Sequence, residues 1–186
     1  YFTLGEHEIS GTLIGWCKDD GIDAGGNSPG TVTVSGCWIE SCFHEGLALS
    51  GTDKIVRVLD SVIINCGQAV EVGYLSPNVT LERCLLTGNG VGARFGDNYG
   101  GGHLGFLSMT GTLSIFNQRD VWGMSRDWWA EKISRMKIER NYLFKPHESF
   151  PDNWVWEPTA HSGLLSPFLS ESPFVPGIGF RGWDRL

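Results

Sequence analysis

Hydrophobic residues return along this chain at intervals of 23 to 29 residues. The pattern is clearest when the sequence is aligned on a column of mostly small or polar residues, the anchor column: Thr12, Cys37, Ser61, Cys84, Thr112 and Asn141. Five positions before each anchor stand His7, Val32, Val56, Val79, Leu107 and Met136. Three positions before each anchor stand Ile9, Val34, Val58, Leu81, Met109 and Ile138. One position after it stand Leu13, Trp38, Val62, Leu85, Leu113 and Tyr142. We expect each apolar column to be a ladder of stacked side chains that faces the core.

The local spacing indicates β-strands. Apolar positions two residues apart, such as Val32 and Val34, are typical of a strand, because alternate side chains face the same side. A repeat of about 24 residues favours coils wound around one axis. Leucine-rich repeats have a similar period, but their Leu-x-x-Leu-x-Leu frame is absent from this sequence.

These columns resemble the pectate-lyase-like superfamily of right-handed parallel β-helices over roughly residues 5–145. The resemblance implies an all-β solenoid of about five coils within residues 1–145. We expect residues 146–186, rich in Pro and aromatic residues, to form an extended tail that packs along the helix and leads to a further domain. Enzymes and inert stalks share this fold, so the activity must be argued from individual residues.

All five cysteines fall in two of the columns, where they act as small apolar fillers. Cys17, Cys42 and Cys66 stand five positions after their anchors, where Asn89 and Asn117 continue the series, and Cys37 and Cys84 are themselves anchors. We expect stacked reduced thiols. A disulfide between adjacent coils is an alternative, because the strand spacing of about 4.8 Å permits one. A metal site is disfavoured, because the sequence has no Cys-x-x-Cys pair.

One polar cluster follows the column that begins at Cys17. If the pairs Ile22/Ala24, Leu47/Leu49, Val70/Val72 and Ala93/Phe95 face inward, the residues between them face outward. This outward row is Asp23, Ala48, Glu71 and Arg94. The adjoining turns add Asp19, Asp20, His44, Glu45 and Gln68, and Asp97 closes the row. The candidate catalytic residues are therefore Asp19, Asp20, Asp23, His44, Glu45, Glu71 and Arg94.

Two interpretations of this cluster stay open. Asp and Gly are favoured in turns, so the cluster can be a solvated acidic face. Alternatively, the layout loosely resembles polygalacturonase-type β-helix hydrolases, in which an Asp pair precedes a Gly-His-Gly on the next coil; here the matches are Asp19-Asp20 and His44, with Glu45 in place of a Gly. The resemblance implies an acid–base site. A calcium-dependent lyase would instead use the carboxylates for the metal and Arg94 as the proton acceptor.

The overall charge limits the classes of partner that the chain can bind. With a net charge of −7 and a pI near 5.1, the chain should repel nucleic acids and anionic membranes. No run of 18 apolar residues exists, so we expect no membrane insertion. The chain starts at Tyr1 without a signal peptide, and we expect a fragment of a larger secreted or cell-surface bacterial protein.

The sequence favours a non-catalytic module that serves as a stalk, an adhesin or a carbohydrate-binding surface. The alternative is a polysaccharide hydrolase or lyase. A polysaccharide is the expected partner, with calcium if the glycan is acidic. Open strand edges at the ends also predict end-to-end self-association.

Overall fold

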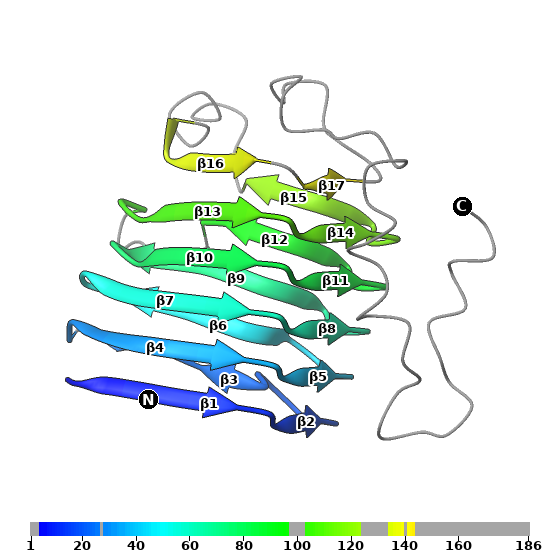
Figure 1. Ribbon diagram of the computed structural model, residues 1–186, viewed down its shortest axis with the longest axis horizontal. Helices are drawn as coiled ribbons and strands as arrows, with labels where there is room; N and C mark the ends of the chain where they lie inside the picture. Colours follow the sequence, from blue (N-terminus) through cyan, green and yellow to red (C-terminus); the bar gives the residue numbers. More distant parts are fainter. Residues whose placement is uncertain (1–3, 27, 97–102, 124–133, 140, 144–186) are drawn as a thin grey trace.

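The computed structural model describes residues 4–26, 28–96, 103–123, 134–139 and 141–143. Their strands form three parallel sheets, which stack as the three walls of one solenoid of about five coils (Figure 1). The first wall contains β1 (Glu6–Ser10), β4 (Gly30–Ser35), β7 (Lys54–Leu59), β10 (Asn78–Glu82), β13 (Phe106–Thr110) and β16 (Met136–Glu139). The second contains β2 (Leu13–Gly15), β5 (Trp38–Glu40), β8 (Val62–Ile64), β11 (Leu85–Thr87), β14 (Leu113–Ile115) and β17 (Tyr142–Leu143). The third contains β3 (Ile22–Asp23), β6 (Glu45–Gly51), β9 (Gln68–Leu75), β12 (Val91–Phe95) and β15 (Arg119–Gly123).

The strand register confirms the alignment made from the sequence. In the first wall, Val34 pairs with Ile9 on one side and with Val58 on the other, and the same column continues through Leu81, Met109 and Ile138. Val34, Val58 and Leu81 are 0% exposed. Full burial of an aliphatic side chain of this size contributes about 1.5–3 kcal/mol relative to its exposure to water.

One predicted column faces the other way. Trp38, Val62 and Leu85 were expected to line the core, but they lie on the outer side of the second wall, where they form a cluster separate from the core. Their neighbours Ile39 and Ile63 occupy the core instead. The anchor residue turns inward at the corner, so the next residue starts a new strand with its side chain outside.

The corners between walls share one backbone conformation. The residue before each anchor from Thr12 to Thr112 adopts positive φ, and so does the residue before each member of the Cys17 column; Gly36 (58°) precedes Cys37, and Asn65 (56°) precedes Cys66. Buried side chains then bridge successive coils: the Asn89 side chain accepts a hydrogen bond from the Cys66 backbone N–H at 2.8 Å, and Asn117 accepts one from the Asn89 N–H at 3.0 Å. These bonds satisfy backbone donors that the sharp corner takes out of the strand ladder.

The cysteines are free thiols, as the column pattern predicted. Hydrogen bonding to Cys66 raises the pKa of Cys42, and the same contact lowers the pKa of Cys66. The thiols therefore touch from coil to coil without a covalent bond.

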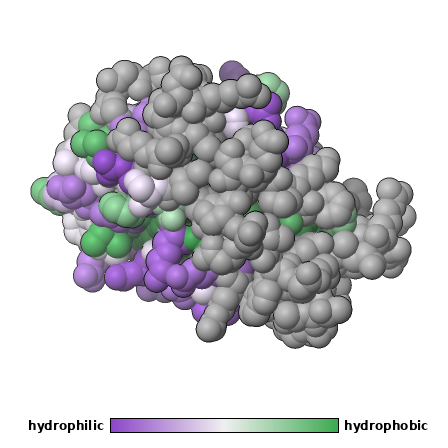
Figure 2. Space-filling view, turned by 90° about the horizontal axis from the view of Figure 1, so that it is seen from above, coloured by the Kyte–Doolittle hydropathy of each residue, from purple (hydrophilic) through white to green (hydrophobic). Residues whose placement is uncertain are grey.

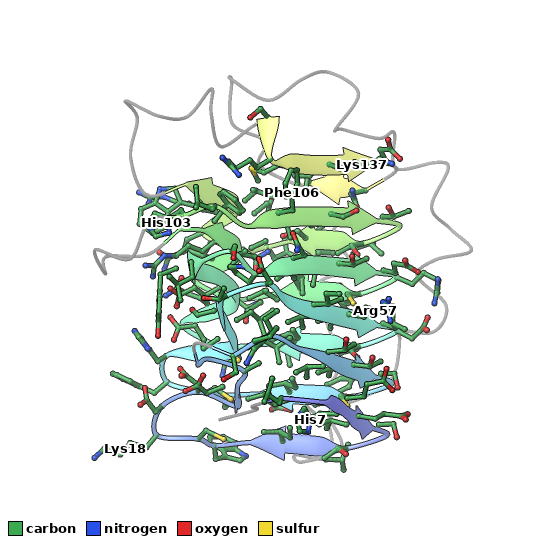
Figure 3. The ribbon with its side chains drawn as sticks, turned by 90° about the vertical axis from the view of Figure 1, so that its left-hand side faces the viewer. His7, Lys18, Arg57, His103, Phe106 and Lys137 are labelled. Atoms are coloured by element: carbon green, nitrogen blue, oxygen red, sulfur yellow. The ribbon has the colours of Figure 1, made fainter. Side chains whose placement is uncertain are left out.

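The described surface is mixed in polarity. Figure 2, which looks along the solenoid axis, shows hydrophilic side chains with hydrophobic ones between them. Arg57 of β7 and Lys137 of β16 are exposed on the first wall (Figure 3). Among the described residues there is no helix with the length and apolar character that a membrane crossing requires. The tail expected at residues 146–186 lies outside the described residues.

Candidate functional site

The third wall carries the candidate residues on its outer side. Ile22 pairs with Leu47, and Val70 pairs with Leu47 and Ala93, and all four side chains are buried in the core. The residues after them form the outward row that the sequence predicted, in which Ala48 pairs with Asp23 and Glu71, and Glu71 pairs with Arg94. The row continues to Trp122 of β15, which pairs with Arg94.

The turn into β6 places His44 and Glu45 over the preceding coil. The His44 N–H donates to the Asp19 carbonyl at 3.4 Å, and the Gly21 N–H donates to the Glu45 carbonyl at 2.9 Å. The Asp20 carboxylate accepts a hydrogen bond from the Glu45 N–H at 3.2 Å. These bonds fix Asp19, Asp20, His44 and Glu45 as one group on two adjacent coils.

Gly46 makes this turn possible. A Cβ at this position would lie 2.5 Å from a methyl group of Ile63 and 2.8 Å from the Ala69 carbonyl oxygen. Only glycine leaves room for that approach, so the chain can pass close to the next coil directly after Glu45.

The His44 imidazole joins three carboxyl groups. Its Nδ1 lies 2.6 Å from Oε2 of Glu45 and 3.6 Å from Oδ1 of both Asp19 and Asp20. Because Oε2 of Glu45 and Oδ1 of Asp20 share this neighbour, they are at most 6.2 Å apart, the sum of 2.6 and 3.6 Å. The side chains differ sharply in burial: Glu45 is 1% exposed, Asp20 18%, His44 56% and Asp19 84%. The imidazole therefore connects a buried carboxyl group with solvent.

The Glu45 carboxyl group also faces a buried network on the next two coils. The Gln68 side-chain amide donates a hydrogen bond to Oε1 of Glu45. Oε1 of Gln68 in turn accepts a bond from Nη1 of Arg94 at 3.1 Å. Arg94 also donates from Nε to the Gly96 carbonyl at 2.8 Å and lies 3.6 Å from Oε1 of Glu71. Glu71 and Arg94 are both buried, so the solvated-face interpretation is wrong for Glu45, Glu71 and Arg94.

Burial changes the protonation of Glu45. Desolvation, a hydrogen bond with Asp20 and repulsion from Glu71 raise the pKa of Glu45 to about 9. The carboxyl group is therefore protonated at neutral pH. A buried carboxylic acid beside two other carboxyl groups is an arrangement in which one acid keeps its proton at neutral pH.

Three residues could together hold a metal ion. One ligand atom each from Asp19, Asp20 and His44 lies within 4.8 Å of the others. Two carboxylates and an imidazole suit a divalent cation. Glu45 touches this set through His44, whereas Glu71 lies beside Arg94.

The comparison with protein families agrees with the fold. The family model described as a right-handed beta helix region matches residues 3–105. The chain belongs to the right-handed β-helix family. No curated protein and no solved structure matches it significantly. Membership in this family indicates that the coil is right-handed. It does not specify an activity, so any chemistry must be argued from the polar residues on the third wall.

The β-helix geometry separates Asp23 from the other candidates. Asp23 belongs to the outward row, but Oδ1 accepts a hydrogen bond from the Gly25 N–H at 2.6 Å, a local turn contact. Asp97 lies outside the described residues. The other six candidates, Asp19, Asp20, His44, Glu45, Glu71 and Arg94, are connected to one another through direct contacts or through Gln68.

Sequence reasoning did not assign a role to two exposed aromatic residues beside the cluster. Phe43 is 83% exposed directly before His44, and Trp16 is 66% exposed on the preceding coil at a positive φ of 59°. The Phe43 N–H donates to the Cys17 carbonyl at 3.0 Å, which places the two turns side by side. The signal was present in the alignment: Trp16 occupies the corner position where Asn65 and Gly88 stand in later coils, and Phe43 occupies the position where Gly67 and Gly90 stand. Lys18, the residue before Asp19, also extends outward from this edge (Figure 3).

Proposed function

We propose that the chain is a polysaccharide-cleaving β-helix module of an exported protein, with His44 as the group that exchanges a proton with the glycan. The observation that carries this proposal is the 2.6 Å contact between a solvent-facing imidazole and a fully buried carboxyl group. A purely solvated turn does not require a buried acid behind its histidine. A proton-transfer site does, because the acid sets the tautomer and supplies the proton.

The protonation states define the step. At neutral pH Glu45 is protonated, and in the proposed step its Oε2–H donates to Nδ1 of His44 while the ring proton is on Nε2. Nε2–H passes this proton to the glycosidic oxygen as its bond to the anomeric carbon breaks, and Nδ1 takes the proton of Glu45. Water adds to the anomeric carbon and gives a proton to the Asp20 carboxylate. The cleaved glycan gains one water. Return of the Nδ1 proton of His44 to Glu45, together with transfer of the Asp20 proton through solvent to Nε2, restores the site.

Exposed aromatic rings beside His44 suit the binding of a sugar polymer. Phe43 and Trp16 present exposed rings on neighbouring turns, and aromatic faces pack against the apolar faces of sugar rings. Both lie on the coils that carry Asp19, Asp20 and His44, so a bound chain would pass over the imidazole. An acidic glycan would need a cation, for which Asp19, Asp20 and His44 offer ligand atoms.

The test is a cleavage screen with matched variants. The purified chain is incubated with neutral and acidic polysaccharides, with and without calcium, and new reducing ends and unsaturated products are measured. His44→Gln and Glu45→Gln should each lower the rate at least about 100-fold, the usual contribution of a general acid. Glu8→Gln, an exposed change on β1, is the control and should leave the rate unchanged. Equal rates for wild type and His44→Gln would refute the assignment.

A second candidate is a non-catalytic carbohydrate-binding module. The observation that favours it is the mutual pairing of the buried charges, since Arg94 is engaged by Gln68, Glu71 and the Gly96 carbonyl and is not directed at a ligand. The screen separates the two functions: this candidate predicts glycan retention without product, and loss of retention in a Phe43→Ala, Trp16→Ala double variant.

A further inference from the structure

Three cysteines, Cys17, Cys42 and Cys66, stand on adjacent coils at the corner between the second and third walls. The Phe43 N–H donates to the Cys17 carbonyl at 3.0 Å, which keeps the first two coils in register at this corner. The Gly67 N–H donates to the Cys42 carbonyl at 3.2 Å and does the same for the next pair of coils. The Cys42 thiol is hydrogen bonded to the thiols on both sides. Neighbouring parallel strands are about 4.8 Å apart, within the Cα separation of about 4.4–6.8 Å that a disulfide spans, so each neighbouring pair is close enough to form one.

The anchor column has the opposite arrangement. Its two cysteines, Cys37 and Cys84, are separated by Ser61, which occupies the coil between them and accepts a hydrogen bond from the Cys37 N–H. Two coil spacings are about 9.6 Å, beyond the Cα separation that a disulfide spans. The chain therefore contains one set of cysteines that can pair between coils and one set that cannot, and the second set is an internal control.

Solvent access decides which pair reacts first. Cys42 and Cys66 are 1% and 5% exposed, whereas Cys17 is only partly buried, between the exposed residues Trp16 and Lys18. A dissolved oxidant therefore meets the sulfur of Cys17 first. Cys42 lies on the adjacent coil and can displace the oxidant from that sulfur. Cys66 lies two coils from Cys17, about 9.6 Å away, and cannot.

We infer that Cys17 and Cys42 are a thiol–disulfide exchange site, which a low-molecular-weight disulfide oxidises to a crosslink between the first two coils. The Cys17 thiolate attacks one sulfur of the dissolved disulfide, whose S–S bond breaks and releases the first thiol. The Cys42 thiolate then attacks the Cys17 sulfur and releases the second thiol. The protons of the two cysteines pass to the two departing thiolates. The cysteines are oxidised by two electrons, and the dissolved disulfide is reduced by the same two.

The exchange is slow at neutral pH. Burial raises the pKa of the Cys17 thiol, and its contact with Cys42 adds to the rise. The thiolate is the attacking species, so a raised pKa leaves little of it and the reaction takes hours rather than seconds. The reduced protein therefore persists long enough to be compared with the oxidised one.

The crosslink would hold the coil that has the fewest partners. Among the described strands, β1, β2 and β3 each lie at the end of a wall and pair with one strand only. The pairing of β3 with β6 covers only Ile22 and Asp23. Cys17 and Cys42 are 42 − 17 = 25 positions apart. Closing a loop of this length restricts the unfolded chain, and for a domain of this size it should raise the melting temperature by about 5–10 °C.

The inference is independent of the proposed function and is tested on the full chain with oxidised glutathione. The reduced protein is incubated with an excess of this disulfide, the remaining thiols are blocked, and peptides from trypsin and Glu-C digestion are identified by mass spectrometry. Cleavage after Lys18 and after Glu40 separates Cys17, Cys37 and Cys42, so the expected link between Cys17 and Cys42 is read directly. The thiols that titrate in denaturant should fall from five to three, and the melting temperature should rise by about 5–10 °C.

Two variants serve as controls. In Cys17→Ser the oxidant should change neither the number of remaining thiols nor the melting temperature, and Cys17→Ala replaces this variant if circular dichroism shows it to be unfolded. Cys84→Ser is the matched control, because Ser61 already occupies the same column, and it should form the crosslink as the wild type does.

Three results would overturn the inference. The first is an unchanged thiol count and melting temperature in the treated wild type. The second is a product other than the expected one, either a Cys42–Cys66 link or a glutathione adduct on Cys17 that Cys42 does not displace. The third is the loss of as many thiols from Cys17→Ser as from the wild type, because the oxidant would then act without Cys17.

Discussion

Replacing Glu45 by Gln should make the protein less sensitive to alkali. Glutamine has the shape of a protonated glutamic acid, and its amide can donate to Nδ1 of His44 while its oxygen accepts from Gln68. The wild-type carboxyl group has a pKa of about 9 in the folded chain and 4.5 as its reference value. A folded pKa above the unfolded one means that stability is fully present below pH 4.5 and is lost as pH rises toward 9.

The pH range between these two pKa values sets the size of the change in stability. Each pH unit between the two pKa values lowers the free energy of unfolding by at most about 1.4 kcal/mol, so the change from pH 5 to pH 8 is bounded by about 4 kcal/mol. Sharing of the proton with Asp20 and His44 reduces this to about 1–2 kcal/mol. For a domain of this size that corresponds to about 2–8 °C in melting temperature.

The assay is a series of thermal melts of wild type, Glu45→Gln and the control Glu8→Gln from pH 5 to pH 8. The melting temperature of Glu45→Gln minus that of wild type should rise by about 2–8 °C across the series. The same difference for Glu8→Gln should stay constant. A flat difference for Glu45→Gln would show that Glu45 ionises normally, and the proton-transfer argument would fail with it.

Four further outcomes are expected. Val58→Asp puts an unpaired charge into the fully buried first wall and should cost more than about 4 kcal/mol, so that no cooperative melt remains. Gly46→Ala forces a Cβ against Ile63 and the Ala69 carbonyl, and should lower the melting temperature. Titration with a thiol reagent in denaturant should find five free cysteines, and a count of three or fewer would contradict the stacked thiols. The edge strands β1 and β16 each have a single partner in the first wall among the described strands, so light scattering should detect association at high concentration; a constant monomer mass would contradict it.

The columns predicted the fold well because a solenoid repeats the same local environment. The Val34 column and the Cys66–Asn89 column could both be located from spacing alone, since every coil presents the same pleat and the same corner. The direction in which the column that contains Trp38 faces could not be predicted, because its apolar residues form a buried cluster of their own outside the core. The spacing of apolar residues therefore shows which side chains are buried, and it does not show whether they face the core or the outer side of a wall.

The sequence predicted which residues belong to the site better than it predicted their burial and contacts. The outward position of Glu71 and Arg94 followed from strand alternation. That the two residues are buried and tied to Gln68 did not follow, because burial on the outside of a wall depends on long side chains from three coils that fold over one another. The contact of His44 with Glu45 depends on the tight turn at Gly46, which no repeat spacing encodes.

The in-register columns also govern which insertions and deletions the gene can accept. Removing one residue from β7 would move Val56 and Val58 to the wrong side of the strand and break the pairing with both neighbouring coils. Duplicating or deleting a complete coil, such as the 24 residues from Cys37 to the residue before Ser61, would keep every column continuous. Each coil contacts only its neighbours, so the coil is the unit in which such a protein can change its length.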